Sequence, residues 1–308
     1  MHHRPTLTAV AAAAVLAAAL LGLTAQSASA APQPKGSPAP AAPAAATPSS
    51  KLPGVEPAAV LAGYRQVTST LLTDPANSQV SGTVACPANE KVVGGGAIIS
   101  SSSLAENLNV SVPETDGRTW QVFVNNASAT DGTFRVYADC VRRVNQYAVV
   151  IGTGVANLAG TQTSASVTCP TGTFPLGGGG FASSSSTAVN LNTSIPLTKG
   201  WRVDVNNAST SDETATAYAV CGKKPTGYVQ VVGTSVTVPA GAQSSGATVA
   251  CPTGTKVFGG GGFSSSGATN VDLNSSGPSG QTAWVAYENN GQSSPNTLTP
   301  YAVCGQAT

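Results

Sequence analysis

Six cysteines are the residues whose type and spacing most directly predict chemistry in this chain. They fall into three successive pairs whose members are 54, 52 and 53 residues apart. In an exported chain, an even number of cysteines at corresponding positions indicates structural disulfides rather than reactive or metal-bound thiols. Closing a loop of that length stabilises a fold by about 4 kcal/mol in the chain-entropy model. We therefore predict three disulfides, Cys86–Cys140, Cys169–Cys221 and Cys251–Cys304.

Residues that could transfer a proton are scarce. The only two histidines, His2 and His3, lie in an N-terminal segment that has the features of a removable signal peptide. Without them the chain has no imidazole for Ser-His or Cys-His catalysis, or for a zinc site. No Asp or Glu recurs at the same position relative to all three cysteine pairs, so no repeated carboxylate mechanism is indicated. We predict a non-enzymatic protein with no metal site and no cofactor.

Two sets of polar residues recur with the cysteine pairs and are the candidates for ligand binding. One is an Asn followed two positions later by Ser, and the other is an Asn-Asn pair that begins five residues after a Trp. Amide groups on an outer β surface can hydrogen-bond hydroxyl-rich glycans. The alternative is that each Asn bonds its own backbone at strand ends and turns. The candidate residues are Asn109, Ser111, Asn192, Ser194, Asn274, Ser276, Asn125, Asn206 and Asn289.

All these residues belong to a repeat of about 82 residues that the chain contains three times. Each copy has Cys-Pro, a turn, and a run of glycines whose first member lies eight residues after the Cys. The third position after the Cys is Asn89, Gly172 or Gly254, residue types that tolerate positive φ, so a left-handed turn is expected there. Consecutive glycines suit a β-bulge or the close approach of another strand. No Lys-Ser/Thr follows the glycines, so a phosphate-binding loop is not indicated.

Short alternating segments separated by turn residues predict strands throughout the repeats. We expect an all-β fold of three tandem, disulfide-linked, antiparallel sandwich-like repeats at residues 58–144, 145–225 and 226–308. One closed pseudo-threefold domain resembling a β-prism is the alternative. Alternation along the strands places Trp120 and Cys140 in the core and turns Asp139 towards water.

The remaining sequence indicates where the protein resides. Residues 1–30 have the basic start, apolar run and small-residue cleavage site of a signal peptide, and residues 31–57 form an Ala/Pro-rich spacer.

Of the 14 Lys and Arg only Arg4 lies in the signal, which leaves 13 basic and 13 acidic residues. This neutrality argues against nucleic-acid binding and against steering towards charged partners. No segment predicts a membrane span. We expect a secreted, extracellular protein that can associate with the cell envelope.

The repeat resembles those of exported proteins from high-GC actinobacteria. The resemblance rests on C-P-x-G, the Gly run, Asn-x-Ser-x-Pro, Trp, Asn-Asn and the final Tyr-Ala-Val-Cys, and it covers about Tyr64 to Cys304. It implies export and carries no activity with it. The first copy departs from the pattern, with Asn89, Ala97 and Asp139 in place of Gly, Gly and Val. In architecture alone, three disulfide-bearing β repeats are also similar to the vitelline-membrane outer-layer protein and the prism lectins.

These observations predict a secreted, non-enzymatic, multivalent binding protein whose partner is an extracellular glycan, envelope polymer or envelope protein. Three copies allow weak binding at each repeat to add up if the geometry permits simultaneous contact. Two other functions remain open. One is a structural or interaction protein of the cell surface or spore matrix. The other is a secreted hydrolase inhibitor that uses the loops 127–132 and 209–213 as contacts.

Overall fold

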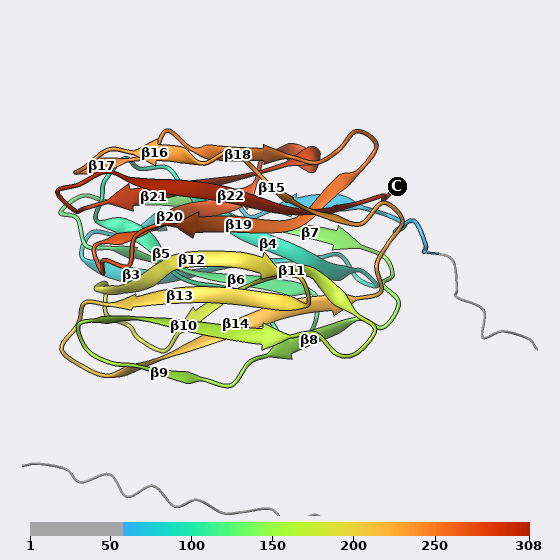
Figure 1. Cartoon of the computed structure of the whole chain (residues 1–308), viewed down its shortest axis with the longest axis horizontal. Coiled ribbons are helices and arrows are strands. Elements are labelled where there is room, and N and C mark those ends of the chain that lie inside the picture. Colours follow the sequence, from blue (N-terminus) through green and yellow to red (C-terminus); the bar gives the residue numbers. More distant parts are fainter. Residues whose placement is uncertain (1–57) are drawn as a thin grey trace, which may run out of the picture. The chain divides into compact units, whose positions relative to one another are not determined.

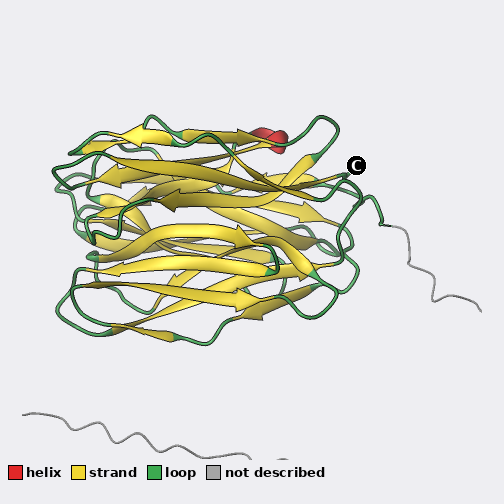
Figure 2. Ribbon diagram, in the orientation of Figure 1, coloured by secondary structure: helices red, strands yellow, loops and turns green. Residues whose placement is uncertain are grey.

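The computed structural model describes residues 58–308, which belong to one compact unit. The predicted signal peptide (1–30) and spacer (31–57) lie outside the described residues. The described part of the chain forms 22 strands, labelled in Figure 1, and one short 3-10 helix, η1 (Gly280–Thr282). Strands and the loops between them make up almost all of it, as Figure 2 shows. The predicted all-β class is confirmed.

The three repeats contribute similar successions of strands. Repeat 1 contains β1 (Arg65–Thr68), β2 (Leu72–Asp74), β3 (Ser78–Ala85), β4 (Lys91–Ile99), β5 (Glu106–Pro113), β6 (Thr119–Asn126) and β7 (Gly132–Val141). Repeat 2 contains β8 (Ala148–Ile151), β9 (Val155–Asn157), β10 (Thr161–Thr168), β11 (Phe174–Ala182), β12 (Val189–Leu197), β13 (Gly200–Asn207) and β14 (Glu213–Gly222). Repeat 3 contains β15 (Val229–Val232), β16 (Val236–Val238), β17 (Ala242–Gln243), β18 (Ala247–Ala250), β19 (Lys256–Ser264), β20 (Val271–Pro278), β21 (Ala283–Asn290) and β22 (Asn296–Gly305).

The strands form three antiparallel sheets, and each sheet takes strands from two repeats. We call these sheets walls. The first wall, ordered β3-β6-β5-β11-β14-β8, joins repeats 1 and 2 by pairing β5 with β11. The second wall, β10-β13-β12-β19-β22-β15, joins repeats 2 and 3 by pairing β12 with β19. The third wall, β1-β7-β4-β20-β21-β17, joins repeat 3 to repeat 1 by pairing β20 with β4. The disulfide-linked repeats therefore close into one domain, as in the β-prism alternative.

Within each repeat, two half-sheets from different walls face each other around a small core. The disulfides Cys86–Cys140, Cys169–Cys221 and Cys251–Cys304 are formed as predicted. Trp120 is 0% exposed between the half-sheets of repeat 1, and its ring lies where a Cβ on Gly95 would come within 2.6 Å of it. The glycine run thus leaves space for the indole, and burying a large apolar side chain contributes about 1.5–3 kcal/mol. The prediction that the Trp packs in the core is confirmed.

Another glycine of each run lies where two repeats meet. At Gly179 an added Cβ would overlap the carbonyl oxygen of Ser111 on β5, the strand that repeat 1 contributes to the junction. Gly96 and Gly261 stand in the same relation to the equivalent serines of their neighbours. Because any side chain here would push β5 and β11 apart, glycine is required for the walls to be continuous.

A β-bulge immediately before each glycine run helps to close the ring of repeats. In β4 the register shifts between Val92 and Gly94, and equivalent shifts occur in β11 and β19. The side chain of a bulge residue points differently from those of its neighbours. The three bulge residues, Val93, Leu176 and Phe258, join one apolar cluster. The first Tyr of each repeat then bonds to the preceding repeat in the ring. The donors are Tyr147 Oη to Val92 O at 2.9 Å, Tyr228 Oη to Pro175 O at 2.8 Å, and Tyr64 Oη to Val257 O at 2.8 Å.

The predicted orientation of Asp139 towards water is wrong. Its side chain is 0% exposed, because the Tyr64 side chain, which reaches across to repeat 3, and the Gln66 side chain of the neighbouring strand β1 lie against it. The Tyr64 hydroxyl and the Gln66 amide donate to its carboxylate at 2.9 and 3.0 Å. Burial raises the pKa of Asp139 to about 7 although these two hydrogen bonds oppose the shift.

Candidate functional site

The residues predicted to bind a ligand lie inside the protein. All nine are at most 8% exposed, so the hypothesis of an outer Asn/Ser surface for glycans is contradicted by their burial. For the first set, the reason is a second β-bulge in each repeat. In β5 the register shifts between Leu108 and Val110, which turns Asn109 out of the normal alternation. The same shifts occur in β12 and β20. The nine buried candidates are Asn109, Ser111, Asn192, Ser194, Asn274, Ser276, Asn125, Asn206 and Asn289.

The buried Asn side chains join each repeat to the next. Asn109 Nδ2 donates to the carbonyl oxygen of Val189 at 2.6 Å, and Asn125 Nδ2 donates to the same oxygen at 2.9 Å. The alternative, that each Asn bonds its own backbone at a strand end or turn, is wrong for these residues, because the accepting carbonyl belongs to a neighbouring repeat. The other junctions have the same pair of bonds, from Asn192 and Asn206 to Val271 O and from Asn274 and Asn289 to Glu106 O.

The recurring Ser residues hold the buried tryptophans. Trp120 Nε1 donates to Ser111 Oγ at 3.0 Å, so the one polar atom of the indole is satisfied inside the core. Repeats 2 and 3 contain the same bond at 2.9 and 3.0 Å. The spacing of Ser and Trp in the sequence therefore reports a structural contact and not a ligand site.

Where the three repeats converge, a buried carboxylate is surrounded by amides. Asp272 accepts a hydrogen bond from Asn289 at 2.9 Å, and longer ones from Asn107 and Asn190 at 3.4 and 3.5 Å. Burial raises the pKa of Asp272 to about 8, and the negative charge of Glu288 adds to the rise, while the amides oppose it. Asp272 is 4% exposed, so this cluster has a structural role at the centre of the ring.

Asp74 and Glu288 are two further buried carboxyl groups with raised pKa values, and neither recurs in all three repeats. Burial raises the pKa of Asp74 to about 7, helped by the nearby charges of Glu106 and Asp131. Burial also raises the pKa of Glu288 to about 7, although hydrogen bonds from Ser264 and Asn296 oppose the shift. Neither Asp74 nor Glu288 is exposed to solvent. Among residues 58–308, no three His, Cys, Asp or Glu side chains are arranged to hold a metal ion.

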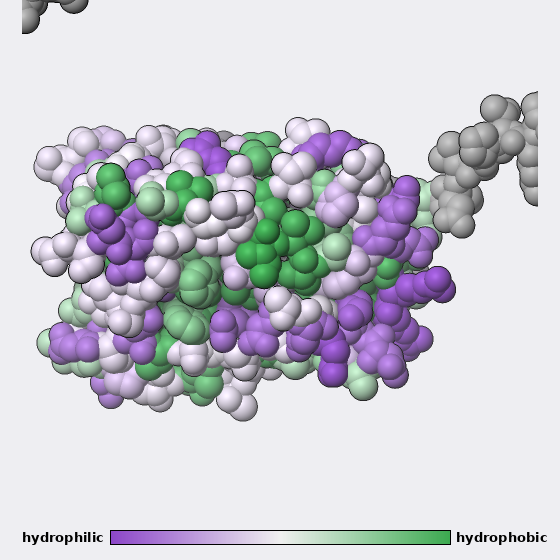
Figure 3. Space-filling model, turned by 90° about the horizontal axis from the view of Figure 1, so that it is seen from below, coloured by the Kyte–Doolittle hydropathy of each residue, from purple (hydrophilic) through white to green (hydrophobic). Residues whose placement is uncertain are grey.

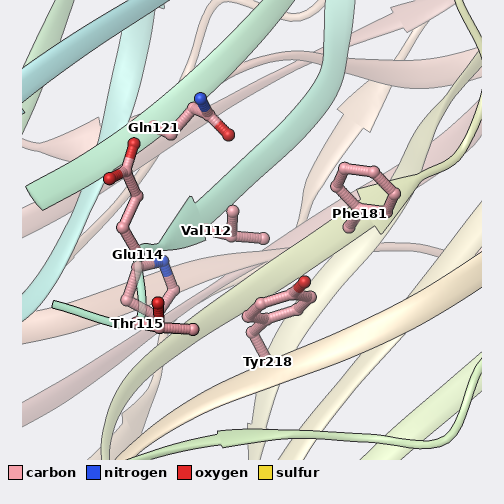
Figure 4. A pocket seen from close by; sticks show the side chains of 7 residues that line it. Val112, Glu114, Thr115, Gln121, Phe181 and Tyr218 are labelled. Atoms are coloured by element: carbon pink, nitrogen blue, oxygen red, sulfur yellow. The ribbon is translucent and has the colours of Figure 1, made fainter. Parts of the chain in front are cut away.

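A concave surface that could receive a ligand lies on the outside of the first wall, where repeats 1 and 2 meet. It is a depression of about 240 Å³. Figure 4 shows Glu114 and Gln121 on one side, Phe181 and Tyr218 on the other, and Val112 between them. The Phe181 and Tyr218 rings are 6.5 Å apart between centroids and tilted by 45°. Burial raises the pKa of Tyr218, so its hydroxyl is protonated at neutral pH and can donate.

Strand pairing explains how distant residues reach this groove, which we call the first-wall groove. Val112 is opposite Gln121 in the β5–β6 pair, while Tyr218 on β14 lies beside Ile151 on β8. Phe181 is opposite Val110 across the junction between the two repeats. The groove therefore forms only where repeats 1 and 2 pair with each other, and either repeat alone provides only half of the lining residues.

The second wall has the same aromatic pair, and the third wall does not. In the second wall Phe263 and Tyr301 occupy the positions of Phe181 and Tyr218, and Arg202, at the position of Gln121, lies 6.0 Å from the Phe263 ring. In the third wall the corresponding residues are Ile98 and Tyr137. The recurring Tyr was visible in the sequence three residues before each final Cys, on the strand face opposite to that Cys. That alternation was the available signal for this site.

Exposed aliphatic residues extend the aromatic pair in the first two walls. Ile151, beside Tyr218, is 46% exposed, and Val232, beside Tyr301, is 59% exposed. Thr68 takes this position beside Tyr137 in the third wall. Figure 3 shows an apolar area near the middle of the face seen from below Figure 1, where β8, β9 and β14 lie. The first and second walls thus share an apolar, aromatic stripe.

Comparison with protein-family models and with curated protein sequences found no match. The resemblance to actinobacterial repeats therefore stays a prediction. The three disulfides indicate an oxidising compartment outside the cytoplasm. Within residues 58–308, the structure contains no helix with the length and apolar character needed to cross a membrane.

Proposed function

We propose that this protein is a secreted, non-enzymatic binding protein that holds uncharged glycan chains on the outer faces of its first and second walls. The observation that supports this proposal is the first-wall groove, in which a Phe–Tyr pair faces Glu114 and Gln121. Aromatic faces pack on the apolar faces of sugar rings, and amide and carboxylate groups accept or donate hydrogen bonds to sugar hydroxyls. The groove is shallow and combines aromatic faces with polar groups, the pairing that a chain of sugar rings requires.

The direction of the apolar stripe suits a chain rather than a single sugar. It crosses β8, β14 and β11, carrying Ile151, Tyr218 and Phe181, and the buried Val112 of β5 lies at its inner end. Neighbouring strands are about 4.8 Å apart, so the stripe extends for roughly 10 Å across the wall. That length accommodates more than one sugar ring along a linear polymer.

Two equivalent walls support multivalent binding. The second wall offers Phe263 and Tyr301 on a different face of the same closed domain. If two segments of one polymer, or two neighbouring chains, bind both walls, weak binding at each adds up to useful avidity. The third wall lacks the aromatic pair and serves as an internal comparison.

The groove does not favour hydrolysis. Cleaving a glycosidic bond normally takes two carboxyl groups that flank the bond, and Glu114 is the one carboxyl among the residues that line the first-wall groove. The acids with raised pKa values, such as Asp74 and Asp139, are buried away from solvent. These observations support binding without catalysis.

Retention on insoluble neutral polysaccharides, followed by titration with soluble oligosaccharides, tests the proposal. We expect Phe181→Ala combined with Tyr218→Ala to weaken binding at least tenfold, because both stacking faces of the first wall are lost. Tyr137→Ala, the matched control in the third wall, should leave binding unchanged. Failure of the wild-type protein to bind any neutral glycan would overturn the proposal, and self-association that Tyr218→Ala abolishes would point to a structural protein instead.

A further inference from the structure

The charged residues are divided unequally between the two ends of the walls. We call one end the linker end, because it carries the segments 142–147 and 223–228 that connect the repeats. Antiparallel pairing places the starts of β4 and β19 there too, with Lys91 opposite Val141 and Lys256 opposite Gly305. Of the eleven Lys and Arg within residues 58–308, nine lie at the linker end. The other two, Arg135 and Arg202, lie within β7 and β13.

The two connecting segments carry paired cations at equivalent positions. Arg142 and Arg143 follow β7, and Lys223 and Lys224 follow β14; all four side chains are exposed. Arg118 and Lys199 occupy corresponding hairpins of repeats 1 and 2 at the same end. The remaining members of the nine are Arg65, Lys91 and Lys256.

Few acidic groups compensate for this charge. Four acidic side chains lie at the linker end; Glu90 is 5% exposed and paired with Arg65 at 3.0 Å, and Asp139 is fully buried. Glu114 and Asp116 lie together in one hairpin. In the described part of the chain, Arg65 is the one cation of the nine with an acidic partner within 4.0 Å. The linker end is therefore basic although the whole chain is nearly neutral.

In the described part of the chain, the opposite end lacks basic residues but is only weakly acidic, because burial raises the pKa values of Asp74, Asp272 and Glu288 to about 7 or 8. Within residues 58–308 it contains seven acidic residues and no Lys or Arg. Asp131, in the β6–β7 loop, and Asp212, in the β13–β14 loop, are its exposed members. The net charge predicted no steering towards charged partners, but this separation gives each end a potential of its own.

Aromatic rings hold several of the cations in place. Lys199 Nζ lies 3.4 Å from the centroid of the Phe174 ring, and Lys224 Nζ lies 4.0 Å from the same centroid. Lys91 Nζ lies 5.4 Å from the centroid of the Tyr147 ring. These cation–π contacts orient the ammonium groups without neutralising them, so their charge stays available to a partner. They also occupy the ring faces on which a nucleic-acid base would stack.

We propose that the linker end binds a linear phosphate-bearing polymer and recognises it by charge alone. Arg presents a planar fork that matches phosphate, Lys supplies a mobile point charge, and the two connecting segments offer a pair of each kind. A chain of regularly spaced phosphates can contact both pairs at once. Two large apolar side chains that are exposed here, Val60 at 44% and Leu197 at 38%, form too small an apolar face for insertion into a bilayer.

Binding of long-chain inorganic polyphosphate, measured by calorimetry over a range of salt concentrations, tests this proposal. We expect affinity to fall steeply with salt, because each contact releases a counterion. Replacing Arg142, Arg143, Lys223 and Lys224 together by Gln should weaken binding at least tenfold. The slope of log K against log salt should become shallower by about 3, which is roughly 0.7 per removed contact.

Single-charge variants provide the matched comparison. Arg142→Gln should weaken polyphosphate binding measurably, whereas Arg135→Gln, which removes an exposed cation outside the linker end, should not. All these side chains are exposed, so the thermal unfolding of the variants should match that of the wild type and exclude misfolding as the cause. Combining Phe181→Ala with Tyr218→Ala should leave polyphosphate binding intact, which separates this proposal from that for the walls.

Three outcomes would overturn the proposal. One is the absence of polyphosphate binding even at low salt. Another is binding of vesicles rich in an anionic phospholipid without competition by polyphosphate, which would assign the linker end to a membrane surface. The third is binding of DNA that polyphosphate does not displace, which would require contacts with bases and not with charge.

Discussion

The side-chain amide of Asn109 and the main-chain carbonyl of Val189 form a 2.6 Å hydrogen bond across the junction between repeats 1 and 2. Both residues are buried, and the equivalent bonds at the other two junctions complete a ring. Polar residues that recur in every copy thus report the contacts between copies.

Replacing Asn109 by Ala should lower the free energy of unfolding by about 1–3 kcal/mol, because it removes a buried hydrogen bond and leaves a cavity. Urea denaturation measures the change. Asn145→Ala, in an exposed position of the segment between repeats, is the control and should stay within about 0.5 kcal/mol of the wild type. Unchanged stability together with lost glycan binding would instead assign Asn109 to a binding surface.

Replacing Gly179 by Ala should destabilise the protein more than an ordinary surface change. The new Cβ would overlap the Ser111 carbonyl, so β5 and β11 would have to separate. We expect a loss of about 1–3 kcal/mol or more, the usual cost of overpacking. Gly267→Ala is the control, since its nearest neighbour would be Gln162 Oε1 at 3.7 Å. Equal melting temperatures for the two variants would show that the close approach is not required.

Stability should fall as the pH rises from about 4 to about 8. Burial raises the pKa values of Asp74, Asp139, Asp272 and Glu288 to about 7 or 8. The folded protein therefore binds these protons more tightly than the unfolded chain, in which the carboxyl pKa is about 4. The stabilisation is complete below the unfolded pKa and is lost as the pH rises through the folded pKa. Melting temperatures should accordingly be higher at pH 5 than at pH 8.

Asp139→Asn should flatten this pH dependence, because the amide does not titrate while its Oδ1 can still accept from Tyr64 and Gln66. Asp116→Asn provides a contrast of the opposite sign. Burial alone would raise the pKa of Asp116, but hydrogen bonds from Arg118 and Thr119 outweigh burial and lower it. Its stabilisation is therefore present above the unfolded pKa, and its loss should not flatten the profile between pH 4 and 8. A melting temperature that increases from pH 5 to pH 8 would contradict the pH prediction.

Removing one disulfide should weaken the whole domain and not a single repeat. Cys169→Ala combined with Cys221→Ala should cost about 4 kcal/mol in the chain-entropy model. Because each half-sheet of repeat 2 continues into a neighbouring repeat, we expect one cooperative transition at a lower denaturant concentration. Two separate transitions would show that the repeats unfold independently, contrary to the shared walls.

Local patterns predicted much of the fold correctly. Cysteine spacing gave the pairing because repeats preserve equivalent contacts, and alternation placed Trp120 in the core because strand side chains have a period of two. Asn89, Gly172 and Gly254 have φ values of 65°, 82° and 83°, as expected from residue types that tolerate a left-handed turn. These properties depend on a few neighbouring residues, so they can be recognised in the sequence.

Alternation failed where a bulge or a side chain from a distant segment changed the environment. Asn109 lies at a bulge that interrupts the period of two, and the Tyr64 and Gln66 side chains bury Asp139 on a face that would otherwise meet water. The first-wall groove combines Val112 of repeat 1 with Tyr218 of repeat 2, and the linker end gathers cations from segments far apart in the chain.

The sequence by itself determined a β repeat, its three copies and its disulfides, because each follows from short-range periodicity and from spacing. Only the tertiary structure decided that strands of neighbouring repeats pair with one another, so that the three repeats close into a ring. That closure depends on backbone groups of one repeat approaching the glycines and amides of another, and no local pattern specifies which copy a strand edge will meet.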